Sequence, residues 1–366
     1  MVFPWGEFVI EKFVHGGNVY APSPSGTWLD FSANINPLGL APAVRAAIAE
    51  NIDGVVNYPD PEARELKAAL AEHYQVLRER LVLGNGAAEL FYLFLNTVRP
   101  KAVLVPVPSF SEYERSALAA GAKVEYFPLP LAYGLSLDMA ALAGEARRSG
   151  AEVVIVGNPN NPTGQLLETA ELEGFLRATE DMAKPPWLLV DESFLDFRRD
   201  GEFYCARGLL ETYGRLFIVQ SLTKFYALPG LRLGFGIGSQ ELVRKLELSK
   251  DVWNVNYLAQ KAGVAALRQQ AYACETVKLV EEERRFLFEG LSKFKGIVPY
   301  PPTVNFLLLR LENMSSVDFA AAVRQQGILV RDCSNYPGLD ECHVRVAVKN
   351  RQDNEKLLAA VAEVCS

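Results

Sequence analysis

The sequence contains few residues of the kinds that bind metals or form disulfide bonds. Its three histidines lie far apart among 366 residues, which argues against a metal site. The cysteines are scattered and odd in number, and none forms a C-x-x-C pair: Cys205, Cys274, Cys333, Cys342 and Cys365. This pattern is typical of free thiols in a reducing compartment and excludes a disulfide framework. We therefore expect a cytoplasmic protein without a structural metal.

Long apolar runs and an excess of basic residues are also absent. No apolar run approaches the length that a membrane span needs. The segment 1–10 lacks the basic start and the small-residue cleavage site of a signal peptide. The formal net charge is −7 at pH 7, whereas nucleic acid selects for basic surfaces. The sequence predicts no membrane partner and no nucleic-acid partner.

What the sequence does have is a repeated alternation of apolar strands and helices. From residue 80 to residue 219, near-continuous apolar strands alternate with helical segments, which predicts a mostly parallel α/β sheet covered by helices. Segments 305–310, 328–331 and 343–348 read as strands, and 316–326 and 352–364 as helices, so the C-terminal part predicts a smaller α+β domain. We expect an N-terminal arm with part of the small domain (1–45), a large domain (46–250), and an interdomain helix with the C-terminal small domain (251–366).

One stretch, from Ser221 to Phe235, combines two chemical abilities. Ser221 and Thr223 supply hydroxyls and Arg232 a guanidinium, and these groups hold a phosphate. Lys224 lies between them and can bind an aldehyde covalently. Pyridoxal 5′-phosphate (PLP) needs both, because its aldehyde lies near its own phosphate. The structural alternative is a strand, a Pro-Gly turn and a second strand with one exposed lysine.

Three further polar motifs fall where predicted strands end, which is where open α/β sheets bind ligands. Asp191 could keep the pyridine nitrogen of PLP protonated, or it could form an N-cap or an ion pair. Asn161 could donate to the ring 3-oxygen. The amides of Gly86, Ala87 and Ala88 open a predicted helix and could bind a phosphate, or they could be an ordinary helix start. Phe110 could stack on the PLP ring or belong to the core.

Taken in order, these motifs carry a family resemblance. The chain resembles the fold-type I PLP enzymes, the aspartate aminotransferase superfamily, through Gly84-Asn-Gly86, Asn160-Asn-Pro-Thr-Gly164, Asp191-Glu-Ser-Phe194, Ser221-Leu-Thr-Lys224 and Gly230-Leu-Arg-Leu-Gly234. Within that group it is similar to the histidinol-phosphate aminotransferase branch, and most of all to the family of L-threonine-O-3-phosphate decarboxylases of cobalamin biosynthesis. The closer likeness lies in His15-Gly-Gly-Asn18 and in residues 30–39, 58–60, 221–232 and 335–340.

The resemblance implies roles for these residues in PLP binding. Lys224 binds PLP covalently, and Asp191 pairs with the pyridinium. Ser221, Thr223 and Arg232 hold the cofactor phosphate together with the Gly86, Ala87 and Ala88 amides. Tyr58 reaches the cofactor phosphate of the other subunit, so we expect a homodimer with shared active sites.

The resemblance also implies a substrate site. Arg345 binds the α-carboxylate and Arg331 the phosphate of a phosphorylated amino acid. The remaining substrate contacts that we expect are His15, Gly16, Gly17, Asn34 and Asn161. His15, the two glycine amides and Asn34 have the chemistry to grip a phosphate, although a plain turn at the N-terminal arm is the structural alternative.

The expected reaction is the PLP-dependent decarboxylation of L-threonine O-3-phosphate to (R)-1-amino-2-propanol O-phosphate. Phe194 supports it, because the aminotransferase branch usually has at this position a Tyr that bonds the ring 3-oxygen. The alternatives are a histidinol-phosphate or related amino-acid aminotransferase, and decarboxylation of phosphoserine, whose missing methyl is worth only about 1–3 kcal/mol in an apolar pocket. A non-catalytic effector domain of a transcription regulator is a third alternative, but no basic extension of domain length precedes the fold.

Overall fold

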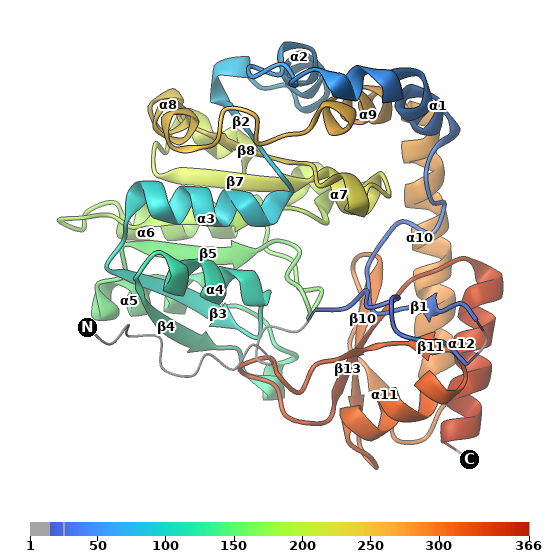
Figure 1. Cartoon of the computed structure of the whole chain (residues 1–366). Coiled ribbons are helices and arrows are strands. Elements are labelled where there is room, and N and C mark those ends of the chain that lie inside the picture. The colour runs from blue at the N-terminus through green and yellow to red at the C-terminus, as the bar shows by residue number, and fades with distance from the viewer. Residues whose placement is uncertain (1–14, 25, 366) are drawn as a thin grey trace, which may run out of the picture.

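The computed structural model describes residues 15–24 and 26–365, and Figure 1 shows them as two layered units joined by a long helix. Over these residues, the larger unit has a seven-stranded sheet and the smaller one a four-stranded sheet. In spatial order, the larger sheet consists of β2 (Leu81–Gly84), β8 (Gly234–Gly238), β7 (Leu216–Ser221), β6 (Trp187–Asp191), β5 (Val153–Gly157), β3 (Ala102–Val107) and β4 (Lys123–Pro128).

The larger sheet is mostly parallel, as the sequence predicts. Strands β4, β3, β5, β6 and β7 pair in parallel, while β8 runs antiparallel to both of its neighbours, β7 and β2. The carboxyl ends of β5, β6 and β7 therefore meet at one edge of the sheet. In Figure 1 this edge faces the smaller unit.

The apolar runs of the strands arise because both faces of the sheet are buried. In β6, Leu188 and Val190 pack into the core on one face and Leu189 into the core on the other. In β7, Ile218 and Val219 divide in the same way. One core includes residues of α1 (Pro42–Asn51), α2 (Arg64–Tyr74), α5 (Met139–Ser149), α6 (Thr169–Thr179), α7 (Leu222–Phe225) and α9 (Tyr257–Leu267). The other includes residues of α3 (Ala87–Val98), α4 (Ser111–Ala119) and α8 (Gln240–Ser249).

The smaller unit is the α+β unit that the sequence predicts. Its antiparallel sheet has the order β12 (Arg331–Asp332), β13 (His343–Ala347), β10 (Phe306–Leu311) and β9 (Ile297–Pro299), with helices α11 (Ser316–Gln325) and α12 (Arg351–Val364). The single strand expected at 328–331 is two short strands instead. β11 (Ile328–Leu329) pairs in parallel with β1 (Leu29–Asp30), whereas β12 pairs with β13.

Helix α10 (Gln270–Leu291) connects the two units. Its 22 residues span about 33 Å at the usual helical rise. Val280 packs into the core of the larger unit, and Leu287 and Leu291 pack into the core of the smaller one. The helix thus holds the two units at a fixed spacing, while the domain boundaries at about residues 45 and 250 stay predictions.

A short N-terminal segment also bridges the two units. The Ala347 N–H donates to the carbonyl oxygen of Phe31 at 2.8 Å, and the Asn36 N–H donates to that of Lys224 at 3.1 Å. The Asn36 side chain donates further to the Phe225 carbonyl oxygen at 2.6 Å and to Thr276 Oγ1, on α10, at 2.7 Å. Because these bonds are buried, they fix the segment against the lysine-bearing turn.

Candidate active site

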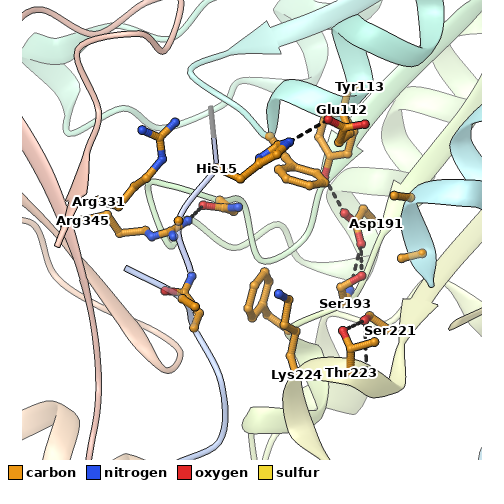
Figure 2. A pocket seen from close by; sticks show the side chains of 18 of the residues that line it. His15, Glu112, Tyr113, Asp191, Ser193, Ser221, Thr223, Lys224, Arg331 and Arg345 are labelled. Atoms are coloured by element: carbon orange, nitrogen blue, oxygen red, sulfur yellow. Dashed lines mark hydrogen bonds and ion pairs between the residues drawn. The ribbon is translucent and has the colours of Figure 1, made fainter. Parts of the chain in front are cut away.

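A cleft of about 350 Å³ lies between the two units, and most of the predicted site residues line it. Figure 2 shows Arg331 and Arg345 on one side of this cleft, and Asp191, Ser193, Ser221 and Thr223 on the opposite side. The predicted residues found in the lining are His15, Gly16, Asn34, Ala87, Ala88, Phe110, Asn161, Asp191, Ser221, Thr223, Lys224, Arg232, Arg331 and Arg345.

Lys224 is positioned by the short helix α7, which begins directly after β7. Ser221 caps this helix, since its Oγ accepts from the Thr223 N–H at 3.3 Å. The pKa of the Lys224 amine is lowered to about 8, first by burial and then by the cations Arg345 and Arg232, while the charges of Asp191 and Asp30 act in the opposite direction. At this pKa a substantial fraction of the Lys224 amine is neutral near physiological pH, as an aldehyde-binding lysine requires.

Asp191 ends β6 and is held in one orientation. Tyr113 Oη donates to Oδ2 at 2.7 Å, and the Ser193 N–H and Oγ donate to Oδ1 at 3.0 and 2.5 Å. Burial raises the pKa of this carboxyl, while these donors and the charge of Lys224 act in the opposite direction. The three hydrogen bonds therefore hold an oriented carboxyl group at the cleft, where it could accept the N–H of a pyridinium.

The hydroxyls, the guanidinium and the start of α3 converge in a phosphate cradle. Ser221 Oγ and Thr223 Oγ1 lie 2.6 Å apart. Gly86 has a φ of 84°, and a Cβ there would lie 2.2 Å from Arg232 Nη2, so only glycine leaves room for the guanidinium beside the helix start. Gly86 does not line the cleft itself. Lysine, carboxylate and cradle together fit the aldehyde, the ring nitrogen and the phosphate of PLP.

Two arginines of the smaller unit form the opposite side of the cleft. Arg331 on β12 and Arg345 on β13 are direct partners in the antiparallel ladder, so their side chains lie on the same face, and each is only 6% exposed. Arg345 donates through Nη1 to Asn161 Oδ1 and through Nη2 to the Ser32 carbonyl oxygen at 2.7 Å. Its Nε has no hydrogen-bond partner among the described residues.

Arg331 is held by its own part of the chain. It donates through Nη1 to the Asp332 carbonyl oxygen and through Nη2 to Asn335 Oδ1 at 2.8 Å, and its guanidinium carbon lies 5.0 Å from the centre of the Tyr336 ring. An arginine in an apolar strand is costly without such partners. These partners hold both guanidinium groups in orientations from which they can contact a ligand in the cleft.

Residues His15 and Gly16 contribute to the lining of the cleft. Gly16 approaches Ser32 so closely that a Cβ on it would lie 2.2 Å from the Ser32 carbonyl oxygen. The Gly17 N–H donates to Ser32 Oγ at 2.7 Å, and Gly17 does not line the cleft, so its role as a substrate contact stays a prediction. Asn34 is buried in the lining, and its Oδ1 has no partner among the described residues.

Several lining residues are not among the predicted ones. Ser32 accepts from Arg345, Tyr113 and Ser193 orient Asp191, and Glu112 accepts from His15 Nε2 at 2.8 Å. The spacing Asp-x-Ser at 191–193 is a local signal for the Ser193 contact. The other three depend on contacts between distant parts of the chain, which the sequence pattern does not encode locally.

Tyr58 lies outside the cleft of its own chain. Its side chain is exposed (76%), and it stacks on Trp253 with ring centres 4.1 Å apart, next to the exposed Val55 and Val56. The contact of Tyr58 with the cofactor of another subunit stays a prediction.

Two kinds of feature are missing from residues 15–24 and 26–365. No group of three or more His, Cys, Asp and Glu side chains is arranged to hold a metal ion. No helix there combines the length and the apolar content needed to cross a membrane.

Comparison with known proteins places the chain among aminotransferase-like enzymes. The family model for class I and II aminotransferases matches residues 26–361. The chain is 36% identical to the threonine-phosphate decarboxylase of Salmonella typhimurium, over 96% of each protein. It is 38% identical to a provisionally named threonine-phosphate decarboxylase of Caldanaerobacter subterraneus, over 96% of this chain and 94% of that protein.

Solved structures include both types of relative. The histidinol-phosphate aminotransferase of Clostridium acetobutylicum superposes with a TM-score of 0.85 at 33% identity, covering 92% of this chain and 98% of that one. The L-threonine-O-3-phosphate decarboxylase of Porphyromonas gingivalis superposes with a TM-score of 0.82 at 25% identity, with the same coverage. The chain therefore belongs to the class I and II aminotransferase family of PLP-dependent enzymes.

Proposed function

We propose that the protein is a PLP-dependent decarboxylase that converts L-threonine O-3-phosphate into (R)-1-amino-2-propanol O-phosphate for cobalamin biosynthesis. One observation carries the substrate class: Arg345 and Arg331 present two cationic groups to the cleft that also contains Lys224. A phosphorylated amino acid has two anionic ends that match them. The names of the relatives from Salmonella typhimurium and Porphyromonas gingivalis support the choice of substrate.

In this proposal PLP occupies the cleft on the side of the larger unit. Lys224 binds its aldehyde, Asp191 binds its ring nitrogen, and Phe110 and Asn161 contact the ring. Ser221, Thr223, Arg232 and the amides at the start of α3 bind its phosphate. When bound, PLP supplies an electron sink that stabilises the negative charge left on the substrate Cα by the departing group.

The chain's own residues decide which bond at Cα breaks. The bond perpendicular to the cofactor ring is weakened most, so orientation of the substrate selects the reaction. Arg345 binds the α-carboxylate, while Arg331, His15 and Asn34 hold the phosphate at the far end. With both ends fixed, the substrate would have little rotational freedom, so these residues could hold the Cα–carboxylate bond in the orientation that decarboxylation needs.

Lys224 then moves the proton that completes the reaction. Decarboxylation releases CO2 from Cα, and Cα must gain one proton to give the amine product. With a pKa lowered to about 8 by burial and by nearby cations, Lys224 Nζ can carry a proton and release it again near neutral pH.

Phe194 favours decarboxylation over amino transfer. It lines the cleft and packs edge-on against Phe306, with ring centres 5.1 Å apart, and it has no hydroxyl to offer to the cofactor. Histidinol-phosphate aminotransfer remains the second candidate, because the Clostridium acetobutylicum structure with that name is 33% identical to this chain.

We further propose a homodimer in which the exposed surface around Tyr58 covers the partner's active site. Val55, Val56, Tyr58 and Trp253 form an exposed apolar patch on the larger unit. A patch of this kind on a soluble enzyme is typical of a subunit interface. In the dimer, Tyr58 would contact the partner's cofactor phosphate.

The proposed function is tested by measuring CO2 release from L-threonine O-3-phosphate and from L-serine O-phosphate, with and without 2-oxoglutarate. We expect CO2 from the first substrate without any 2-oxo acid, and a slower reaction with the second. A protein that releases no CO2, and that turns over histidinol phosphate only when 2-oxoglutarate is present, would instead be the aminotransferase.

A further inference from the structure

We propose that Glu112 is a positioning residue that holds His15 in place to bind the substrate phosphate. The inference rests on the proposed function, because it takes His15 as a phosphate contact. The role concerns a buried carboxylate of the larger unit and a histidine of the N-terminal arm that are 97 residues apart in the sequence.

The contact itself is well defined. Glu112 lies in the first turn of α4, and its Oε1 is 2.8 Å from His15 Nε2. The Glu112 side chain is only 8% exposed, whereas that of His15 is 43% exposed. The half-exposed histidine at the cleft therefore contacts a buried carboxylate. Figure 2 shows the contact between the two side chains.

Glu112 is able to play this role as a charged group. Burial raises the pKa of its carboxyl, but hydrogen bonds from His15 and Tyr92 and the charge of Arg115 together bring it below the ordinary value. Tyr92 Oη donates to Oε2 at 3.0 Å, and Arg115 Nη1 donates to Oε1 at 3.3 Å. Three donors surround the Glu112 carboxylate and offset its negative charge. They therefore reduce the repulsion between this carboxylate and an incoming phosphate.

The hydrogen bond at Nε2 determines which ring nitrogen of His15 can bond a ligand. The Nε2–H donates to Glu112, so a bond to a phosphate oxygen must come from Nδ1–H, which is present when both ring nitrogens carry a proton. The His15 ring also packs against Phe110, with ring centres 5.7 Å apart and planes tilted by 48°. Phe110 and Glu112 both belong to the start of α4, so a single helix end fixes the ring. A contact held this firmly loses less rotational freedom on binding the substrate.

Different protein groups support the residues that bind the two anionic ends of the substrate. Arg345 receives its support from Ser32 and Asn161, whereas His15 receives its support from Glu112. Loss of Glu112 should therefore weaken recognition of the phosphate and leave recognition of the carboxylate intact. A residue that merely stabilised the fold would affect both.

The test compares two buried glutamates of the same helix in the PLP-loaded enzyme. Glu114 is also buried, but it hydrogen-bonds Tyr126 and does not line the cleft, so Glu114→Ala is the matched control. We expect Glu112→Ala to raise the KM for L-threonine O-3-phosphate about tenfold, the usual effect of losing one hydrogen bond to a charged group. The kcat should change less than threefold in Glu112→Ala, and Glu114→Ala should match the wild type in both constants.

A double-mutant cycle with His15→Ala decides the issue. If Glu112 acts through His15, Glu112→Ala should have no further effect on KM once His15 is absent. Inhibition by inorganic phosphate should follow the same pattern, and it needs no turnover of a particular substrate. Additive effects in the cycle, or an equal rise in KM in Glu114→Ala, would overturn the proposal.

Different measurements would contradict the proposed decarboxylase function and the proposed role of Glu112. If the wild-type enzyme releases no CO2, the decarboxylase assignment is wrong, yet the cycle on phosphate inhibition still shows whether Glu112 positions His15. If the wild type releases CO2 and the cycle is additive, only the role of Glu112 is wrong.

Discussion

Replacing Arg345 by lysine should lower kcat/KM for L-threonine O-3-phosphate by about 10- to 100-fold. Arg345 donates to Ser32 and Asn161 and so uses two N–H groups of the five in a guanidinium, which leaves three, including Nε, for the substrate carboxylate. Two charge-assisted hydrogen bonds are worth about 1.5–3 kcal/mol each. Lysine keeps the charge but makes only one of them, so about 1.5–3 kcal/mol is lost.

The assay is steady-state CO2 release, with thermal unfolding as a check on folding. Arg310→Lys is the matched control, because Arg310 belongs to the adjacent strand β10 of the same sheet but is exposed. It should leave kcat/KM within about twofold of the wild type. If Arg345→Lys also stays within twofold while its stability is unchanged, Arg345 does not bind the carboxylate.

Three other predictions follow from the same cleft. Borohydride should fix PLP to the peptide that contains Lys224, and Lys224→Ala should show no lysine-bound cofactor absorbance; label on a different lysine would contradict this assignment. Burial and nearby cations lower the Lys224 pKa to about 8, so uptake of PLP by the apoenzyme should accelerate as pH rises through 8 and the reactive neutral amine accumulates, and a rate that is flat from pH 6.5 to 9 would refute it. Tyr58→Phe should weaken PLP binding, and mixing Tyr58→Phe with Lys224→Ala subunits should restore some activity; an active monomer in light scattering would exclude the shared site.

Much of the large sheet could be predicted, because strands buried on both faces are continuous apolar runs. Our sequence analysis includes β8, Gly234–Gly238, only as the second strand of the structural alternative, because its alternate glycines have low strand propensity. The structure explains them: a Cβ at Gly236 would lie 2.3 Å from the Phe217 ring, and one at Gly234 would lie 2.5 Å from the Ala87 nitrogen. Close packing against a neighbouring strand and against a helix start selects glycine here.

Helix α5, Met139–Ser149, shows the opposite case. It begins at Asp138, whose Oδ1 accepts from the N–H groups of Ala140 and Ala141, and it ends at Gly150 with a φ of 67°. Both are ordinary boundary signals in the sequence, so this helix could have been predicted although our sequence analysis does not include it. The four residues of α7 are too few for a helical period.

For the site, the sequence indicates the residues that follow strands and misses those that act across the cleft. Asp191 and Lys224 are predictable because the carboxyl ends of parallel strands meet at one edge. The contact between Glu112 and His15 requires the N-terminal arm to return to α4, and the contact between Ser32 and Arg345 spans most of the chain. Such pairs are set by the tertiary fold and not by local spacing.

The fate of the carboxyl carbon tests the central claim most directly. L-threonine O-3-phosphate labelled with 13C in its carboxyl group would be incubated with the PLP-loaded enzyme in D2O, without any 2-oxo acid. The account predicts labelled CO2 and 1-amino-2-propanol O-phosphate that carries one deuterium at C1. Retention of the label in a 2-oxo acid phosphate, with the amino group transferred to the cofactor, would contradict it.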